Sequence, residues 1–272
     1  MLTRFAPAPT GWLHLGHVLN AEYVWNAARE RGGRVLLRIE DHDRERCRPE
    51  YERGILNDLD WLGYSPDVYP TDAFRAGACD GRQSDRGAVY RDAVDRLHAL
   101  GLVYGCDCTR RQIPGEQVAD REPRYPGTCR HRGLPVAGGI GWRVRLEPRT
   151  ERFVDERLGR QEQNPQEQCG DVLIRDRHGN WTYQFCAAVD DLAQGIDLVI
   201  RGEDLLASTG RQIALARLLG RDQPAAFLHH PLIMKTPSQK LSKSDGDTAI
   251  RDLRGRGLTP AEVKRAANPM VQ

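Results

Sequence analysis

The N-terminal segment passes from a short apolar start into a helical pattern. Residues 4–6 can begin a strand, but Pro7 and Pro9 stop it from continuing in the middle of a sheet, and the Thr-Gly pair that follows is typical of a turn. A helix is predicted from His17 to the Gly-Gly pair at 32–33. The apolar positions that recur at helical spacing are Val18, Leu19, Val24, Trp25 and Ala28.

Strand and helix patterns continue to alternate through the first hundred residues. A buried strand is predicted over 35–39 and runs into Glu40. It is followed by a helix over 49–64 and, further on, by an amphipathic helix over 87–101. The intervening residues 65–86 are rich in Pro, Asp and Gly and show no clear period, so they are predicted to form a long loop.

The same alternation returns near the C-terminus, after an irregular middle. The middle begins with a short strand over 102–108, contains a strand-like segment at 141–147 and includes a predicted hairpin over 171–185 with a His-Gly-Asn turn. The later elements are a helix over 187–195, a strand over 196–204, a helix over 208–220, a strand over 225–234, and one small helix with a tail. This order predicts a doubly wound parallel α/β domain interrupted by a second, smaller module.

Residues with candidate chemistry lie where several of these strands end. His14 and His17 stand at the entrance of the first helix, whose N–H groups and dipole favour an anion, although both rings could instead only cap or pack. Glu40 and Arg201 follow two other predicted strands. Because a doubly wound sheet binds its ligand outside the C-terminal strand ends, we expect these groups to meet in one crevice.

The composition limits the classes of protein. The chain has 272 residues, a formal net charge of +2 and a sequence pI of about 8.2, which excludes a strongly basic nucleic-acid coat but permits a local basic face. No run of 18 apolar residues occurs, and no basic-then-apolar leader is present. We therefore expect a cytoplasmic protein that does not associate with a membrane.

Lysine is rare and clustered. Of the 40 basic residues only four are lysines, and Lys235, Lys240 and Lys243 fall within nine residues in "MKTPSQKLSKSDG". Lysine is a mobile point charge that suits a phosphate differently from the planar arginine fork, so the cluster indicates an anion-binding loop. The alternative is a chance cluster on a solvated loop.

Three of the seven cysteines are close in sequence. Cys106, Cys108 and Cys129 lie within 24 residues, and in a cytoplasmic chain this pattern indicates a metal before disulfides. Three thiolates need one more ligand for a tetrahedral zinc, and chemistry alone favours His131. The alternative is that all three are buried thiols. The other cysteines, which are expected to pack or lie at the surface, are Cys47, Cys79, Cys169 and Cys186.

Several ordered blocks resemble one enzyme family. "HLGH" and "KLSKS" resemble the HIGH and KMSKS motifs of class I aminoacyl-tRNA synthetases, and "RFAPAPTGWLHLGH", "LLRIEDHDRER", "WTYQFCAAVDD" and "VIRGEDLLASTGRQ" resemble the glutamyl/glutaminyl subclass. The resemblance runs from Arg4 to about Ser244. It implies a Rossmann-like catalytic domain with a zinc-stapled insertion and the substrates ATP and glutamate.

Charge favours glutamate over glutamine as the amino-acid substrate. A glutamate has two carboxylates, for which the arginines Arg4 and Arg201 are suitable bidentate partners. The resemblance implies that Glu40 holds the amino group and that the Tyr183 hydroxyl completes the pocket, although Glu40 could pair with a neighbouring arginine and Tyr183 could be core. Two further pocket residues implied by the resemblance are Ala6 and Ala8, and Ala8 replaces a serine that the family usually has.

The resemblance also assigns the adenylation machinery. A carboxylate of glutamate attacks the α-phosphorus of ATP and pyrophosphate leaves, so positioning and charge stabilisation supply the catalysis. His14 and His17 would contact ATP, Gly16 would let the nucleotide approach the backbone, and Lys240 and Lys243 would close over the pyrophosphate. Mg²⁺ would accompany ATP.

The acceptor is expected to be a modified tRNA. Only 28 residues follow Ser244, which is short for an anticodon-reading domain, and Leu205 stands where full-length glutamyl enzymes commonly have histidine. Both features resemble truncated paralogues that transfer glutamate to queuosine at the wobble position of tRNA(Asp). The expected partners are ATP, L-glutamate and the anticodon stem-loop of that tRNA, with the enzyme as a monomer.

The same resemblance changes the expected zinc ligand and defines the domains. It favours Tyr125, in Y-x3-C, over His131 as the fourth ligand of a structural zinc. The domains are expected to be a first Rossmann half over 1–103, an acceptor-binding zinc insertion over 104–180, a second Rossmann half over 181–246 and a C-terminal helix with a tail over 247–272.

Three alternatives stay open at this point. They are a glutamate-adenylating paralogue with another acceptor, a non-catalytic tRNA-binding or regulatory protein, and a nucleotidyltransferase outside tRNA biology. The intact histidine and lysine motifs argue against the second, and the "RIED" and "RGED" blocks argue against the third. The stretch 71–86 is longer than the family norm and has no assigned role.

Overall fold

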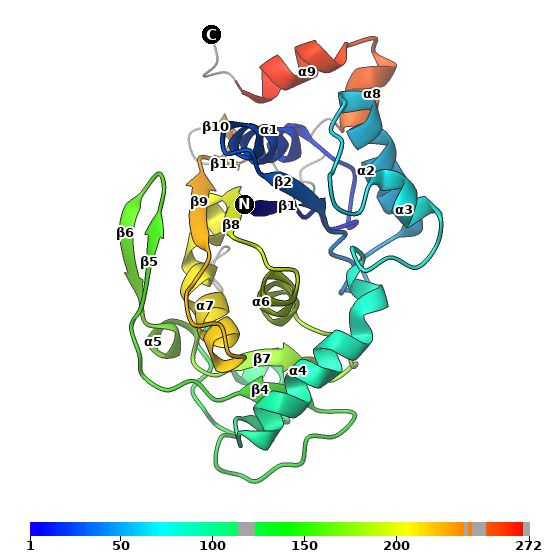
Figure 1. Ribbon diagram of the computed structural model, residues 1–272. Coiled ribbons are helices and arrows are strands. Elements are labelled where there is room, and N and C mark those ends of the chain that lie inside the picture. Colours follow the sequence, from blue (N-terminus) through cyan, green and yellow to red (C-terminus); the bar gives the residue numbers. More distant parts are fainter. Residues whose placement is uncertain (114–122, 237–238, 241–248, 269–272) are drawn as a thin grey trace. The chain divides into compact units, whose positions relative to one another are not determined.

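The computed structural model describes residues 1–113, 123–236, 239–240 and 249–268, and for 234–236 and 239–240 it describes the backbone only. The chain forms two compact units (Figure 1). The first comprises Met1–Arg86, Ile196–Glu203 and Phe227–Gln272, and the second comprises Gly87–Gly195 and Asp204–Ala226.

The first unit is built on a sheet whose central strands are parallel. Its strand order is β2 (Arg34–Leu37), β1 (Leu2–Phe5), β8 (Leu198–Gly202) and β9 (Ala226–His230). β1 pairs in parallel with β2 on one side and with β8 on the other. The chain therefore continues from β1 in one direction and later returns on the opposite side, which is a topological switch point. This arrangement confirms the predicted α/β class.

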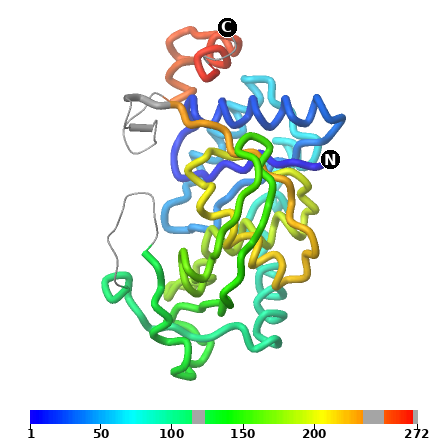
Figure 2. Tube along the Cα trace, turned by 90° about the vertical axis from the view of Figure 1, so that its left-hand side faces the viewer, coloured from blue at the N-terminus to red at the C-terminus, as the bar shows by residue number. Residues whose placement is uncertain are grey.

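Helices bury the apolar strand residues of this unit. The helices are α1 (Leu15–Glu30), α2 (Pro49–Leu62), α3 (Thr71–Arg75), α8 (Ile250–Gly255) and α9 (Pro260–Ala267). The strand residues Phe5, Val35 and Leu37 share one core with apolar residues of these helices. α9 packs against α1, and Figure 2 shows the C-terminal helices, in red, near the N-terminal helix, in blue.

Local signals account for the helix ends. α2 begins with a proline at its first turn, where no N–H partner is needed, and stops at Gly63, whose φ of 75° is in the left-handed region. α9 begins with a reciprocal cap in which the Thr259 hydroxyl accepts from the Glu262 N–H and the Glu262 carboxylate accepts from the Thr259 N–H.

The second unit combines an antiparallel sheet with helices. β3 (Val103–Cys106), β4 (Gly141–Val144) and β7 (Val172–Arg175) form a three-stranded sheet in that order. β5 (Glu151–Asp155) and β6 (Gly159–Gln163) form an antiparallel hairpin. The helices are α4 (Gly87–Ala99), α5 (Pro165–Cys169), α6 (Tyr183–Ala193) and α7 (Thr209–Leu218).

The remaining short elements are distributed over both units. Short 3₁₀ turns occupy Gln83–Arg86, Arg110–Gln112 and Glu203–Ser208. In the first unit, β10 (Met234–Thr236) pairs with β11 (Gln239–Lys240).

Two predicted elements differ in the structure. The hairpin predicted over 171–185 is wrong beyond its turn: Asp176 Oδ1 accepts from the N–H groups of His178 and Asn180, but the returning chain makes one bridge, Arg175 to Trp181, and then enters α6. The apolar residues of 183–193 bury as a helix, and this tertiary packing overrides a second strand. The long loop predicted over 65–86 contains α3 and a 3₁₀ turn.

Other differences concern elements that carry no strong sequence signal. The hairpin of β5 and β6 and the short α5 lie in a stretch for which no element was predicted, and the C-terminal residues form two helices in place of one. Within the residues that the structure describes, no helix is long and apolar enough to cross a membrane.

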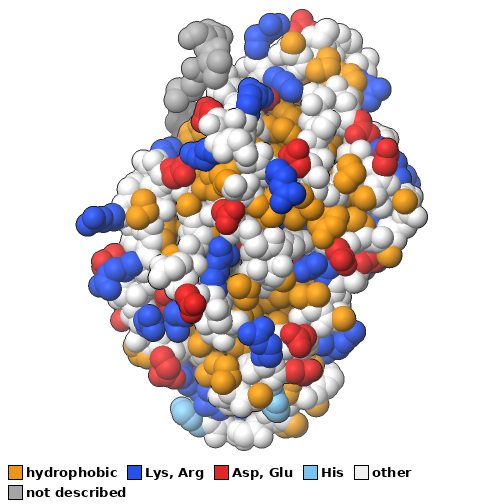
Figure 3. Space-filling view, viewed as in Figure 1, with side chains coloured by type: hydrophobic (Ala, Val, Ile, Leu, Met, Phe, Trp, Pro, Cys, Tyr) orange, Lys and Arg blue, Asp and Glu red, His pale blue; other side chains and the backbone are white. Residues whose placement is uncertain are grey.

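Figure 3 shows basic and acidic side chains interspersed over the visible face, in keeping with the small net charge.

Candidate functional site

Three residues that are predicted to bind the substrate glutamate lie on or just after the parallel strands of the first unit. Arg4 belongs to β1, Arg201 to β8, and Glu40 follows β2. The pairing continues past Phe5, because the Arg38 N–H donates to Phe5 O at 2.9 Å and the Glu40 N–H donates to Pro7 O at 3.0 Å. Pro7 and Pro9 have no N–H group to donate to a neighbouring strand. The Pro7 carbonyl can still accept a hydrogen bond, so the chain stays beside the segment after β2 as far as Glu40.

Both arginines are buried and bonded to neighbouring strands. Arg4 and Arg201 are each 4% exposed. Arg4 Nη1 donates to Ile200 O of β8 at 3.1 Å, and Arg201 Nε donates to His229 Nε2 of β9 at 3.1 Å. Such buried cations need acceptors around them, and a carboxylate ligand can supply further acceptors for their N–H groups.

Glu40 lies beside another buried cation. Its Oε1 is 3.7 Å from Nη1 of Arg38, a side chain with no exposed surface. The contact with a neighbouring arginine that the sequence left open is therefore present. It does not exclude binding of an ammonium group, since a carboxylate has two oxygens and about four acceptor positions.

The two histidines form a reciprocal cap at the start of α1. His14 is the N-cap, and its Nδ1 accepts from the Gly16 N–H at 3.1 Å, while His17 Nδ1 accepts from the His14 N–H at 3.1 Å. Their ring centroids are 4.0 Å apart. Because both Nδ1 atoms accept, a neutral ring carries its proton on Nε2, so Nε2 is the atom of each ring that can donate. The capping alternative and the phosphate-site interpretation are thus compatible.

Gly16 is required by the His14 ring. A Cβ at this position would lie 2.9 Å from His14 Cε1 and 3.1 Å from His14 Nδ1. Real Cβ atoms essentially never come within 3.0 Å of such a neighbour, so a side chain here would require the ring to shift. The absence of a side chain thus allows the cap itself, in addition to the nucleotide approach expected from the sequence.

The backbone after β2 is held from its other side by residues of the 71–86 stretch. The Ile39 N–H donates to Gly81 O at 2.9 Å, and the Gln83 N–H donates to Ile39 O at 3.1 Å. Asp41, which is buried, accepts from the Ser84 N–H at 2.8 Å. Glu40 is therefore bracketed, with Pro7 on one side of its backbone and this stretch on the other.

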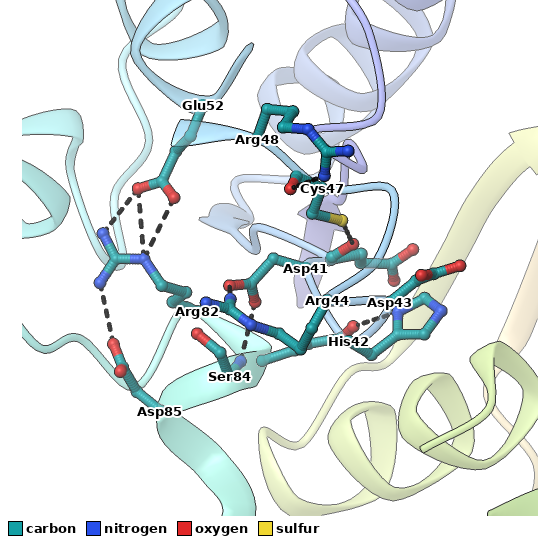
Figure 4. Close-up of polar contacts among 12 residues, drawn as sticks. Asp41, His42, Asp43, Arg44, Cys47, Arg48, Glu52, Arg82, Ser84 and Asp85 are labelled. Atoms are coloured by element: carbon teal, nitrogen blue, oxygen red, sulfur yellow. Dashed lines mark hydrogen bonds and ion pairs between the residues drawn. The ribbon is translucent and has the colours of Figure 1, made fainter. Parts of the chain in front are cut away.

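Arg82 attaches this stretch to α2. Its Nη2 is 2.6 Å from Glu52 of α2, and its Nη1 is 2.8 Å from Asp85, as Figure 4 shows. It also donates to the carbonyl oxygens of Phe74 and Gly77. The bond to Glu52 and, after it, the bond to Asp85 raise the pKa of Arg82, against the opposing effect of partial burial. The stretch that had no assigned role is thus a well-bonded support for the strand end.

Ionisable groups next to Glu40 have perturbed pKa values. Burial lowers the pKa of His42, whose Nδ1 lies 2.8 Å from Gln83 Oε1. Partial burial acts to raise the pKa of Asp43, but the bond and charge of Arg46, together with the backbone N–H groups of Arg46 and Glu45, lower it. Burial, assisted by the charge of Asp41, raises the pKa of Cys47 to about 11, so this thiol stays protonated.

The remaining predicted site residues are spread over the chain. Ala6 and Ala8 are half-buried in the turn after β1, and Ala8 O accepts from the Thr10 N–H at 2.9 Å. Tyr183 is half-buried at the first position of α6, in the second unit. Lys243 lies outside the described residues, and Lys240 is described only by its backbone in β11.

The cysteine cluster lies in the second unit. The Sγ atoms of Cys106, Cys108 and Cys129 all lie within 4.8 Å of one another, and the last two are 3.5 Å apart. A tetrahedral zinc with bonds of about 2.3 Å separates its sulfur ligands by roughly 3.8 Å. The three thiols could therefore hold a metal ion. The Tyr125 hydroxyl is buried here, 3.5 Å from Cys106 Sγ, whereas His131 is exposed.

Two arginines adjoin the same cluster. Arg143 Nε is 3.3 Å from Cys106 Sγ, and Arg132 Nη1 is 3.4 Å from Cys129 Sγ. Burial acts to raise the pKa of Cys106, but its bonds with Tyr125 and Arg143 outweigh this effect and lower it. The arginines would offset the negative charge of several thiolates on one metal ion.

Sequence reasoning missed two residues of β9. His229 and His230 are both buried and contact Arg201 and Asn20, respectively. The signal was two consecutive histidines within the strand predicted over 225–234. It acquires meaning only when the strand order places β9 beside β8.

Comparison with known proteins identifies the family. Residues 1–266 match the family model for tRNA synthetases class I (E and Q), catalytic domain. A glutamyl-Q tRNA(Asp) synthetase from Rhodobacter capsulatus is 39% identical, with 97% of this chain and 99% of the relative covered. A second relative of that name, from Cupriavidus metallidurans, is 43% identical over 91% of this chain and 78% of its own length.

Longer relatives match as well. A glutamate–tRNA ligase from Frankia casuarinae is 38% identical over 96% of this chain, which spans 54% of that ligase. A solved glutamate tRNA ligase from Elizabethkingia meningosepticum, in complex with its amino acid, superposes with a TM-score of 0.74 at 30% identity; 90% of this chain and 52% of that chain are covered. The chain belongs to the class I tRNA synthetases (E and Q) and carries their catalytic domain.

Proposed function

We propose that this enzyme activates L-glutamate with ATP and transfers it to queuosine in tRNA(Asp). The observation that carries the proposal is the similarity, at 39% and 43% identity over most of the chain, to two relatives named glutamyl-Q tRNA(Asp) synthetase. The buried cations at the strand ends of the first unit support a dicarboxylate substrate.

In the proposed glutamate site, each substrate group has a matching partner. Arg4 and Arg201 bind the two carboxylates, Glu40 binds the ammonium group, and the Tyr183 hydroxyl completes the pocket. Ala6 and Ala8 line it, and Ala8 makes no hydroxyl contact. The preference for glutamate over glutamine follows from charge, because a buried arginine facing a neutral amide would lose its counter-charge.

In the proposed first step, a carboxylate oxygen of glutamate forms a bond to the α-phosphorus of ATP. The bond from that phosphorus to the bridging oxygen breaks, and pyrophosphate leaves with its electron pair. His14 and His17 donate from Nε2 to phosphate oxygens at the N-terminus of α1, where the helix dipole also favours negative charge. Gly16 allows the close approach, Lys240 and Lys243 stabilise the departing pyrophosphate, and Mg²⁺ accompanies the ATP phosphates.

In the proposed second step, a hydroxyl of queuosine at the wobble position attacks the glutamyl carbonyl. An ester forms, AMP leaves with the electron pair of the broken bond, and the proton of the hydroxyl is released to solvent. The acceptor is the anticodon stem-loop of tRNA(Asp), and we propose that the insertion over 104–180 binds it. The second candidate acceptor is the 3′ end of tRNA(Glu), favoured by the similarity to a glutamate–tRNA ligase.

We further propose that Cys106, Cys108, Cys129 and Tyr125 hold a structural zinc ion. The spacing of the three sulfur atoms fits zinc, and the oxygen of the buried phenol beside them supplies the fourth ligand. The ion would tie β3 to the segment around Cys129, which lies in an irregular part of the insertion. Zinc release on unfolding would then couple metal binding to the stability of this module.

The test is transfer of radiolabelled glutamate, with ATP, to tRNA(Asp) prepared with and without queuosine, and to tRNA(Glu). Label on the queuosine-containing tRNA(Asp) alone supports the proposal. Label on tRNA(Glu) supports the second candidate. Glutamate-dependent exchange of pyrophosphate without any labelled tRNA would retain the adenylation chemistry and contradict both acceptors.

A further inference from the structure

The guanidinium of Arg201 meets two side chains of β9. Its Nε lies 3.1 Å from His229 Nε2, and its Cζ lies 5.9 Å from the centroid of the Phe227 ring. Phe227 and His229 are two residues apart, so they project from the same face of the strand, and their rings are nearly parallel, with an interplanar angle of 12°. β9 thus presents an acceptor and an aromatic surface to Arg201.

The chemistry of the bond defines the protonation state of His229. An arginine keeps its protons at all accessible pH values, so Arg201 donates and His229 Nε2 accepts. The His229 ring is therefore neutral, with its proton on Nδ1. His229 has no exposed surface, and a hydrogen bond to a cation is stronger and more directional away from water.

This bond determines which edge of Arg201 can face a carboxylate. A guanidinium can grip a carboxylate through Nε and one Nη or through both Nη groups. Since Nε–H points to His229, a bidentate contact has to use Nη1 and Nη2. His229 sits on a strand of the sheet and lacks the freedom of a loop residue, so it restrains rotation of the guanidinium.

We propose that His229 is a positioning residue that orients Arg201 toward the substrate carboxylate. This inference rests on the proposed function, because that function assigns Arg201 to glutamate. His229 itself does not need to touch the substrate. Its contribution is expected in glutamate affinity and not in ATP affinity.

The next residue offers a matched control. His230 is also buried, and its ring lies on the opposite face of β9, stacked on Tyr23 of α1. Its Nε2 is 3.0 Å from Asn20 Nδ2, and its Nδ1 is 2.9 Å from Pro231 O. Replacing His230 removes a buried histidine and its hydrogen bonds without removing the acceptor of Arg201.

Three substitutions separate orientation of Arg201 from packing. H229Q places an acceptor oxygen near the position of Nε2, H229N carries it on a shorter side chain, and H229L removes it. We expect H229L and H229N to raise the KM for glutamate in ATP–pyrophosphate exchange roughly 10- to 100-fold, the range for a lost hydrogen bond to a charged group. H229Q should stay within about threefold of the parent, and the KM for ATP should change less than about twofold in all three.

The outcomes are distinguishable. H230L is expected to lower the Tm about as much as H229L while changing the KM for glutamate less than about threefold. An unchanged KM in H229L, or in H229N should H229L fail to fold, would make His229 a packing residue and overturn this inference alone. Absence of glutamate-dependent exchange in the parent enzyme would overturn the proposed function and this inference together.

Discussion

Replacing Gly16 by alanine should separate catalysis from stability. The new Cβ would lie 2.9 Å from Cε1 of His14, so the ring has to leave the position in which its Nδ1 caps α1. When the ring moves, its Nε2 moves with it and no longer points where a phosphate oxygen is proposed to bind. On the proposed mechanism, G16A therefore displaces one donor to the transition state while leaving His14 in the sequence.

The two free-energy changes differ in size. Loss of an N-cap costs about 1 kcal/mol, and alanine in place of glycine in a helix returns about 0.5 to 1 kcal/mol, so the stability of G16A should stay near that of the parent. Loss of one donor to the developing charge costs about 3 to 4 kcal/mol, or two to three decades in rate. We therefore expect a large fall in kcat without a comparable fall in Tm.

The assay is glutamate-dependent ATP–pyrophosphate exchange, with thermal unfolding of the same samples. G255A is the matched control, because Gly255 ends α8 and a Cβ there would meet nothing within 4 Å. G255A should keep the parent rate. An exchange rate of G16A within threefold of the parent, at equal Tm, would refute the role assigned to the capped ring.

Three further predictions concern the metal cluster, the support of the strand end and a buried carboxyl. Y125F should lose zinc measured by inductively coupled plasma mass spectrometry, whereas H131A should retain it; the reverse result would assign the ligand to His131. R82Q should lower the free energy of unfolding in urea by about 2 to 3 kcal/mol because the ion pair of Arg82 with Glu52 is mostly buried. R75Q should lower it by less than about 1 kcal/mol, since the pair of Arg75 with Asp60 is more exposed. Equal losses in the two variants would contradict this ranking. Burial raises the pKa of Asp58 to about 6, so its ionisation opposes folding as the pH rises from about 4 to 6. The free energy of unfolding of D58N should therefore exceed that of the parent by about 1 to 2 kcal/mol at pH 7.5 but by much less at pH 4. A difference that does not depend on pH would be the contrary result.

The alternation of strand and helix patterns was sufficient to predict the strands β1, β2, β8 and β9 and the helices α1 and α2 of the first unit. Val35 and Leu37 are buried strand residues, and the helix expected from His17 is present as α1, beginning two residues earlier. These predictions succeed because parallel strands buried on both faces read as apolar runs, and because amphipathic helices carry a period that needs no tertiary information. The rule for strand ends predicts that His14, His17, Glu40 and Arg201 share one crevice, and this stays a prediction.

The pattern was less informative where burial is partial or shared. The strand at β5 alternates exposed and buried residues among many charged ones, and no element was predicted there. The stretch before Tyr183 carries a turn signal but only one bridge follows it, because the next residues are more deeply buried as a helix. In these places the choice depends on the surface that other segments offer.

By itself, the sequence determined the α/β class, the motifs and the positions of the candidate ligands, because local periodicity and turn chemistry are written in neighbouring residues. Only the tertiary structure decided which atoms meet. It placed a buried tyrosine and not an exposed histidine beside the cysteines, gave the 71–86 stretch a supporting role next to Glu40, and set His229 against Arg201. Those contacts join separate segments of the chain, and no local pattern encodes which segments pack against one another.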